Sequence, residues 1–297
     1  MIFPKTTCCF GILLLSLLLP AAAHSEWAEW KFKPGAEYRH ENNLNFSAFG
    51  NDKESDNIFN PYVGGGRFYQ LGDRTRLRLT ADLDVHVYDS WDQLNSWSIS
   101  GSAALSHKFG VGLTAPWLRP FLTIGYKDVR ADIRSGRFIH TGIIFGKRFT
   151  PRFDIAANLE YRDRNGKNGV QIVPGIGPDV FDQNRFSISL YGNFLLSEHW
   201  LLSASLGHFD GDFDSACTPE NVAIVLATED VKAITLDSVF GGCVYRLDGK
   251  GNNARADISF SATRHSSLNF GVAYQKGKGD VQDYKNTILR ASFIYSY

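Results

Sequence analysis

Hydrophobic and polar side chains alternate along most of this 297-residue chain. In residues 75–88, apolar side chains occupy the odd positions from Leu77 to Val87, and polar ones occupy the even positions from Arg76 to His86. A period of two predicts β-strands with one apolar and one polar face. Each alternating segment lasts about ten residues, the length that a tilted strand needs to cross a bilayer, whereas strands of soluble sandwiches are usually shorter. We therefore predict a transmembrane β-barrel, with a soluble sandwich as the weaker alternative.

The pattern divides the chain into fourteen predicted strands: residues 27–40, 58–70, 75–88, 96–109, 117–128, 137–149, 153–163, 185–195, 200–208, 221–227, 232–247, 254–264, 268–276 and 287–297. Short connections at 71–74, 150–152 and 196–199 alternate with long ones at 41–57, 163–184, 209–220 and 276–286. Short periplasmic turns and long outer loops are typical of bacterial outer-membrane barrels. The predicted fold class is all-β: an antiparallel up-and-down transmembrane barrel of about fourteen strands, with twelve as the alternative.

Residues 209–247 decide the number of strands. One loop followed by one strand in this region would leave an odd total, whereas single-chain bacterial barrels have even numbers. A turn at 228–230 restores an even number and forms a hairpin that pairs Ile224 with Leu236 on the lipid side. The same hairpin places Cys217 opposite Cys243. Because an exported chain passes through an oxidising compartment, we predict a Cys217–Cys243 disulfide, with two free thiols as the alternative.

The first 25 residues have the three-part layout of a secretory signal peptide. Lys5 supplies the positive charge, residues 10–19 the apolar run, and residues 20–23 the small side chains near a cleavage site. The run is too short for a comfortable membrane span. We therefore predict that residues 1–25 are cleaved and that residues 26–297 form a single barrel domain, with an uncleaved anchor as the alternative.

Composition mainly excludes other classes of protein. The 31 basic and 31 acidic side chains give no net charge, so no nucleic-acid partner is expected. The mean hydropathy of −0.19 is too low for a helical membrane protein. Tryptophans fall near predicted strand ends and predict two aromatic belts. Those near the periplasmic ends are Trp27, Trp30, Trp117 and Trp200, and those near the outer ends are Trp91 and Trp97.

The last strand carries a recognisable pattern at its end. Phe293, Tyr295 and Tyr297 share one face, and the final residue is aromatic. This resembles the C-terminal insertion signal of Gram-negative outer-membrane barrels. Over its full length the chain is similar to small monomeric porins of twelve to fourteen strands. Residues 41–109 and 284–288 have a weaker likeness to the barrel of surface lipoprotein assembly modifiers.

These resemblances imply a location and a set of partners. The location is the bacterial outer membrane, reached through the periplasm. The expected partners are outer-membrane lipids and, during biogenesis, periplasmic chaperones and the barrel-assembly machinery that recognises the C-terminal signal. The resemblance to small porins also implies a monomer.

Sorting the charges by strand face predicts a basic bore, in which inward positions carry about twice as many basic as acidic side chains. The candidates for lining the wall and binding anions are Arg76, Arg78, Lys108, Arg119, Lys127, Arg185 and Arg255. Rings of basic side chains select anions, and arginine binds carboxylates with two hydrogen bonds. The predicted function is a channel for passive uptake of small anionic solutes, such as acidic sugars or organic acids. The alternative is a barrel without transport, acting in surface protein or lipoprotein assembly or as a structural or adhesive scaffold. Loops 41–57 and 163–184 decide whether the bore is open.

Catalytic and metal-binding patterns are weak. His265 and Ser267 are closely spaced but fall in a predicted periplasmic turn, and the chain has no Cys-x-x-Cys motif. Asp210, Asp212 and Asp214 lie in a predicted loop, where they would form either a calcium site or a solvated acidic segment. We therefore expect no enzymatic activity, no cofactor and no metal.

Overall fold

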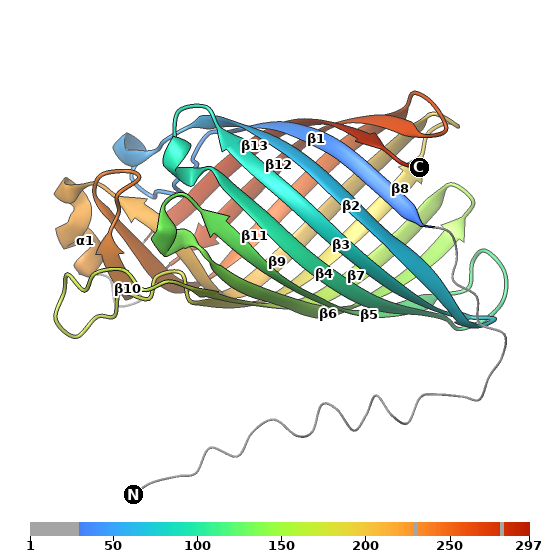
Figure 1. The fold of residues 1–297 in the computed structure, drawn as a ribbon, viewed down its shortest axis with the longest axis horizontal. Coiled ribbons are helices and arrows are strands. Elements are labelled where there is room, and N and C mark those ends of the chain that lie inside the picture. The colour runs from blue at the N-terminus through green and yellow to red at the C-terminus, as the bar shows by residue number, and fades with distance from the viewer. Residues whose placement is uncertain (1–29, 228–230, 280–281) are drawn as a thin grey trace, which may run out of the picture.

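The computed structural model describes residues 30–227, 231–279 and 282–297, which form a closed antiparallel β-barrel (Figure 1). Twelve strands close the barrel, because β9 pairs directly with β11 and β1 pairs with β13. They are β1 (Lys31–Glu41), β2 (Asp56–Gly72), β3 (Thr75–Tyr88), β4 (Ser96–Lys108), β5 (Trp117–Val129), β6 (Gly136–Thr150), β7 (Phe153–Gly166), β8 (Gln183–Leu195), β9 (Trp200–Cys217), β11 (Cys243–Ser261), β12 (Ser266–Lys278) and β13 (Asp283–Tyr295). The predicted fold class is confirmed, with twelve strands in the barrel rather than fourteen.

The difference in strand number arises in residues 209–247. β9 continues into the predicted loop 209–220 as far as Cys217 and pairs with β11 over its whole length. Residues Val222–Leu226 form the short helix α1, so the predicted strand 221–227 and its lipid-facing pairs are wrong. Val222 and Val225, three residues apart as on one helix face, both pack into an apolar core formed by the loops. The predicted turn at 228–230 lies outside the described residues.

One additional strand lies beyond the barrel wall. β10 (Val231–Leu236) pairs with the first residues of β11, from Cys243 to Leu247, and Ala233 forms an isolated parallel bridge with Gly177. Figure 1 shows β10 and α1 together at one end of the barrel. These elements belong to the loops and do not span the wall.

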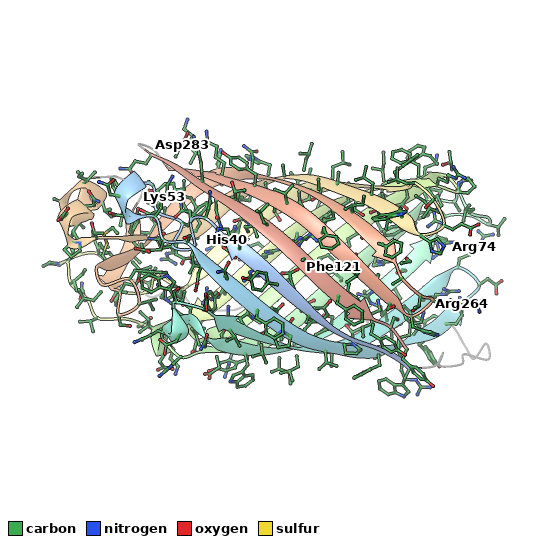
Figure 2. The ribbon with its side chains drawn as sticks, turned by 90° about the horizontal axis from the view of Figure 1, so that it is seen from above. His40, Lys53, Arg74, Phe121, Arg264 and Asp283 are labelled. Carbon is green, nitrogen blue, oxygen red and sulfur yellow. A yellow bond between two sulfur atoms is a disulfide. The ribbon has the colours of Figure 1, made fainter. Side chains whose placement is uncertain are left out.

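The two ends of the barrel carry connections of different length, as the sequence predicts. At one end, here called the turn end, the connections are 73–74, 109–116, 151–152, 196–199 and 262–265. At the other, the loop end, they include 42–55, 89–95, 130–135, 167–182 and the segment between β9 and β11. In Figure 2, Lys53 and Asp283 mark the loop end, and Arg74 and Arg264 mark the turn end. The predicted long loop 276–286 is shorter than expected because β12 and β13 extend into it.

The outside of the wall is apolar, as strand alternation requires. Leu79, Leu83 and Val87 of β3 point outward and are 40%, 41% and 43% exposed. Thr80 and Asp82, which lie between Leu79 and Leu83, line a hollow inside the barrel. An apolar outer band around a polar interior is the arrangement of barrels that span the outer membrane. No helix in the described parts of the chain has the length and apolar character needed to cross a membrane.

The tryptophans follow the predicted belts only in part. Trp30 and Trp200 are exposed near the turn end, and Trp97 is exposed toward the loop end. Trp117 instead lies in the bore, because β5 directs its odd-numbered residues inward, and Trp91 packs against Phe240 of a loop at 4.7 Å. Trp27 lies outside the described residues.

Candidate functional site

A cluster of basic side chains lies inside the loop end of the bore. A cavity of about 350 Å³, here called the loop-end cavity, is enclosed by the loop-end parts of β5, β7, β8 and β9 and by residues of loop 42–55. The charged residues that line it are Lys127, Arg134, Arg162, Arg164 and Arg185, with Glu41 and Asp214 as the acids. The cavity therefore carries an excess of positive charge.

Two of these arginines have carboxylate partners. Arg134 donates to Asp237 at 2.8 Å and lies 3.9 Å from Asp214. Arg162 pairs with Glu160, two residues before it on β7. These pairs anchor the rim of the cavity and neutralise part of its charge.

The other three cations have no such partner. Within the described residues, no carboxylate lies within 4.0 Å of the charged nitrogens of Lys127, Arg164 or Arg185. Arg164 donates to the backbone oxygen of Arg134, and the guanidinium of Arg185 lies over the ring of Phe209 at 4.7 Å. The Nε of Arg185 is buried with no hydrogen-bond partner. Half-buried cations without counter-charges create a strong local attraction for anions.

In the middle of the bore the basic side chains are paired, and the hollow there is lined by three acids and two bases. Asp257 accepts from Arg290 at 2.5 Å and from Arg255 at 2.7 Å, and Arg290 lies 4.0 Å from Glu37. A hollow of about 480 Å³ adjoins this cluster and also contains Asp84. Arg255, a predicted wall residue, is therefore engaged in an ion pair.

A second basic hollow, of about 300 Å³, lies at the turn end and is called the turn-end hollow. Its charged lining residues are Asp73, Arg74, Arg76, Arg78, Lys108 and Arg119. Arg119 donates from Nε to Ser106 at 2.8 Å and lies over the Trp117 ring at 4.6 Å, and Arg76 donates from Nε to Gln70 at 2.6 Å. In both arginines, the hydrogen bond from Nε fixes the orientation of the side chain.

The seven predicted wall residues all line hollows of the bore, but the structure separates them into three groups. Arg76, Arg78, Lys108 and Arg119 lie in the turn-end hollow, Lys127 and Arg185 in the loop-end cavity, and Arg255 in the middle. Sequence reasoning missed Arg164, although it continues the alternation of Glu160 and Arg162 beyond the predicted end of that strand. It also missed Arg134, which lies in a loop where periodicity gives no signal.

Loop 42–55 folds into the loop end of the bore. Its residues Leu44, Asn45 and Phe46 line the cavity. The buried Asn43 holds the loop in place by donating from Nδ2 to the backbone oxygens of Ser47 at 2.8 Å and Lys285 at 2.7 Å. Loop 42–55 therefore narrows the mouth as a fixed element.

Loop 167–182 packs against β10 at the loop end. Val170 and Thr235 of β10 exchange two hydrogen bonds of 2.9 Å, and the amide of Ile234 donates to Gly177 at 2.9 Å. The apolar residues of this loop pack against the core beneath β10 and α1, which accounts for its hydrophobic sequence; they are Ile172, Val173 and Ile176. Apart from Phe181, residues 167–182 do not line the cavity.

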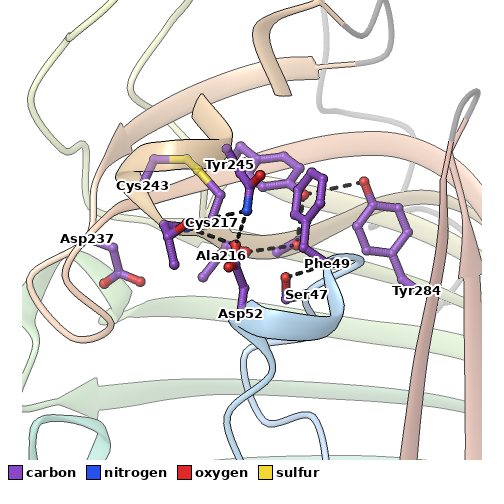
Figure 3. The surroundings of a disulfide bond; sticks show 12 residues. Ser47, Phe49, Asp52, Ala216, Cys217, Asp237, Cys243, Tyr245 and Tyr284 are labelled. Carbon is purple, nitrogen blue, oxygen red and sulfur yellow. Dashed lines mark hydrogen bonds between the residues drawn. A yellow bond between two sulfur atoms is a disulfide. The ribbon is translucent and has the colours of Figure 1, made fainter. Parts of the chain in front are cut away.

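A disulfide joins Cys217 and Cys243, which lie directly opposite each other at the ends of β9 and β11 (Figure 3). Both cysteines are buried in the core of the loop end with Tyr245, whose hydroxyl lies 3.4 Å from that of Tyr284. The bond closes a segment that contains α1 and β10, with a sequence separation of 26.

Reducing this bond should change both the mass and the stability of the loop end. We expect the exported protein to gain about two daltons on reduction, because a disulfide takes up two hydrogens. Cys217→Ala with Cys243→Ala should destabilise α1 and β10 by about 3 kcal/mol through loop entropy, measured by hydrogen exchange. The double variant should show no mass change with reductant. An equal mass of the unchanged protein with and without reductant would contradict the bond.

The predicted acidic loop is part of a strand. Asp210 lies 3.3 Å from Lys250, and Asp212 lies 3.9 Å from Arg246 of β11. Across the described residues, no group of three His, Cys, Asp or Glu side chains has the arrangement of a metal site. His265 lies in the turn between β11 and β12. Its Nδ1 is 2.9 Å from the backbone oxygen of Ser296, which follows β13.

The closed barrel, its apolar outer band and its charged bore define the class of outer-membrane β-barrel proteins. Residues 34–212, more than half of the chain, match the family described as "Putative MetA-pathway of phenol degradation". The chain belongs to this family. A search of curated protein sequences finds no match.

Three solved structures are similar to this chain. An outer membrane channel from Pseudomonas putida F1 is 12% identical with a TM-score of 0.54, covering 90% of this chain and 95% of that chain. The KdgM porin in complex with disordered oligogalacturonate is 11% identical with a TM-score of 0.46, covering 89% and 99%. The NanC porin is 9% identical with a TM-score of 0.48, covering 89% and 98%. The first of these likenesses supports the barrel fold.

Proposed function

We propose that this protein is an outer-membrane channel for small anionic solutes. The observation that carries the proposal is the set of three cations, Lys127, Arg164 and Arg185, that line the loop-end cavity without a carboxylate partner in the described residues. A structural ion-pair network would neutralise these charges, as it does for Arg255 and Arg290 in the middle of the bore.

The distribution of charge along the bore supports passage as well as binding. Basic hollows lie at both ends, and the ion-paired cluster around Asp257 lies between them. Conduction requires sites that attract a solute without holding it permanently, and several separate sites meet this requirement better than one. An anion would be attracted at the loop end, pass the ion-paired middle and meet Arg76, Arg78 and Arg119 at the turn end.

The proposed orientation places the loop end outside the cell and the turn end in the periplasm, as in other outer-membrane barrels. We also propose that residues 1–25 are removed during export and that Phe293, Tyr295 and Tyr297 act as the assembly signal. All three aromatic side chains are exposed on the outward side of the C-terminal segment that closes the barrel.

The sign of the reversal potential tests the channel directly. Full-length mature protein is inserted into a planar bilayer under a gradient of potassium chloride, and we expect a potential of anion-selective sign. A cation-selective potential would contradict the anion preference. Absence of conductance by correctly folded protein would contradict the channel and favour a scaffold role.

A further inference from the structure

The walls of the loop-end cavity indicate which kind of anion fits it. Resting on the proposed channel function, we propose that the cavity binds a small aromatic carboxylate, with its ring against an aromatic wall and its carboxylate on Arg164 and Arg185. The argument depends on the rings, on how the arginines are oriented by them, and on the remaining polar groups.

One wall of the cavity is formed by phenylalanine rings. Phe209 and Phe213 lie four residues apart on the same face of β9, with ring centres 6.1 Å apart, and Phe46 from loop 42–55 meets Phe213 at 5.8 Å. The Phe209 ring lies against Gly251 of the neighbouring strand, where any Cβ would collide with it. The glycine thus leaves room for the ring to lie flat along the wall.

Three arginines that line the cavity are stacked on aromatic rings, and Arg134 shares the Phe181 ring with Arg164. Arg185 lies over Phe209 at 4.7 Å, and Arg164 lies over Phe181 at 5.2 Å. A stacked guanidinium has its face covered, so its N–H groups point outward in its own plane toward a carboxylate. An aromatic carboxylate suits this arrangement because its charged group extends from the edge of its ring, and the ring itself gains edge or offset contacts with the phenylalanines.

The size and the neutral polar groups of the cavity favour an aromatic acid over a sugar acid. A volume of about 350 Å³ is at the small end of the range for ligand sites. Asn45 and Asn286 line the cavity, but their side chains already bond to Glu54, Asp52, Asn43 and Glu41. Among the described residues, this leaves Asn253 and Gln275 as amides without side-chain hydrogen bonds. Two amides provide few neutral partners for the several hydroxyls of a sugar.

Binding to the purified full-length mature protein in detergent separates these ligands. Isothermal titration calorimetry is performed with benzoate, with cyclohexanecarboxylate as the non-aromatic acid, with benzyl alcohol as the neutral ring, and with galacturonate as the sugar acid. We expect benzoate to bind about tenfold more tightly than cyclohexanecarboxylate or galacturonate, and benzyl alcohol more weakly still.

Matched variants locate the site. Arg185→Gln and Phe209→Leu should each weaken benzoate binding by about fivefold or more. Arg137→Gln and Phe145→Leu, which make the same changes on the outward face of β6, should leave it unchanged. The circular dichroism of each variant reports whether the barrel is intact.

Two results would overturn the inference: equal affinity for galacturonate and benzoate, or benzoate binding that is insensitive to both Arg185→Gln and Phe209→Leu in folded protein. An anion-selective channel without aromatic preference would retain the proposed function and reject the ligand class. Specific benzoate binding without conductance would retain the site and reject the channel.

Discussion

Replacing Lys127, Arg164 and Arg185 together with glutamine should remove most of the anion preference of the channel. Each unit charge contributes about 0.7 kcal/mol at 6 Å in water, and physiological salt roughly halves this. Three charges therefore account for about 1 kcal/mol, or about a fivefold change in the anion-to-cation permeability ratio. The ratio is measured from the reversal potential under a salt gradient.

A control with the same loss of charge shows whether position matters. Arg137, Lys147 and Arg152 are exposed outside the bore, and replacing all three with glutamine changes the net charge by the same amount. We expect this variant to retain the original permeability ratio. An equal loss of selectivity in both variants would mean that net charge, and not the loop-end cavity, determines it.

Deleting residues 44–53 should widen the loop end and raise the single-channel conductance at least about twofold. The reason is that Leu44, Asn45 and Phe46 line the cavity, while Glu41 and Asp56 are paired across β1 and β2 and allow a shorter connection. Conductance of single channels in a planar bilayer gives the measurement.

A deletion of equal length in the other long loop provides the comparison. Residues 168–177 pack on β10 and outside the cavity, so we expect their removal to have a smaller effect on conductance. If this second deletion raised the conductance more than the first, loop 167–182 and not loop 42–55 would be the main obstruction of the bore.

In the region between β9 and β11, the alternation of apolar and polar residues did not predict the secondary structure. Cys217 lies opposite Cys243 because β9 and β11 pair antiparallel, and not because residues 221–227 and 232–247 form the predicted hairpin. The strand 221–227 was wrong because five apolar-rich residues fit a short helix as well as a strand, and alternation cannot distinguish them. Packing of Val222 and Val225 against Ile234 and Tyr245 decides in favour of the helix.

For the charged residues of the bore, the sequence predicted which side chains point inward but not which of them form ion pairs. Alternation placed Arg76, Arg185 and Arg255 correctly on inward faces, because strand geometry depends only on neighbouring residues. Whether each charge is free depends on side chains from other strands. Arg255 is paired with Asp257, whereas Arg185 lies over the Phe209 ring and has no carboxylate partner among the described residues.

By itself, then, the sequence determined the barrel and its two faces, since a period of two is a local property of the chain. Only the tertiary structure decided that twelve strands close the wall and that loop 42–55 enters the bore. It also decided which basic side chains lack a counter-charge. These features depend on contacts between residues far apart in the chain, such as Asn43 with Lys285 and Arg134 with Asp237, and no local pattern encodes them.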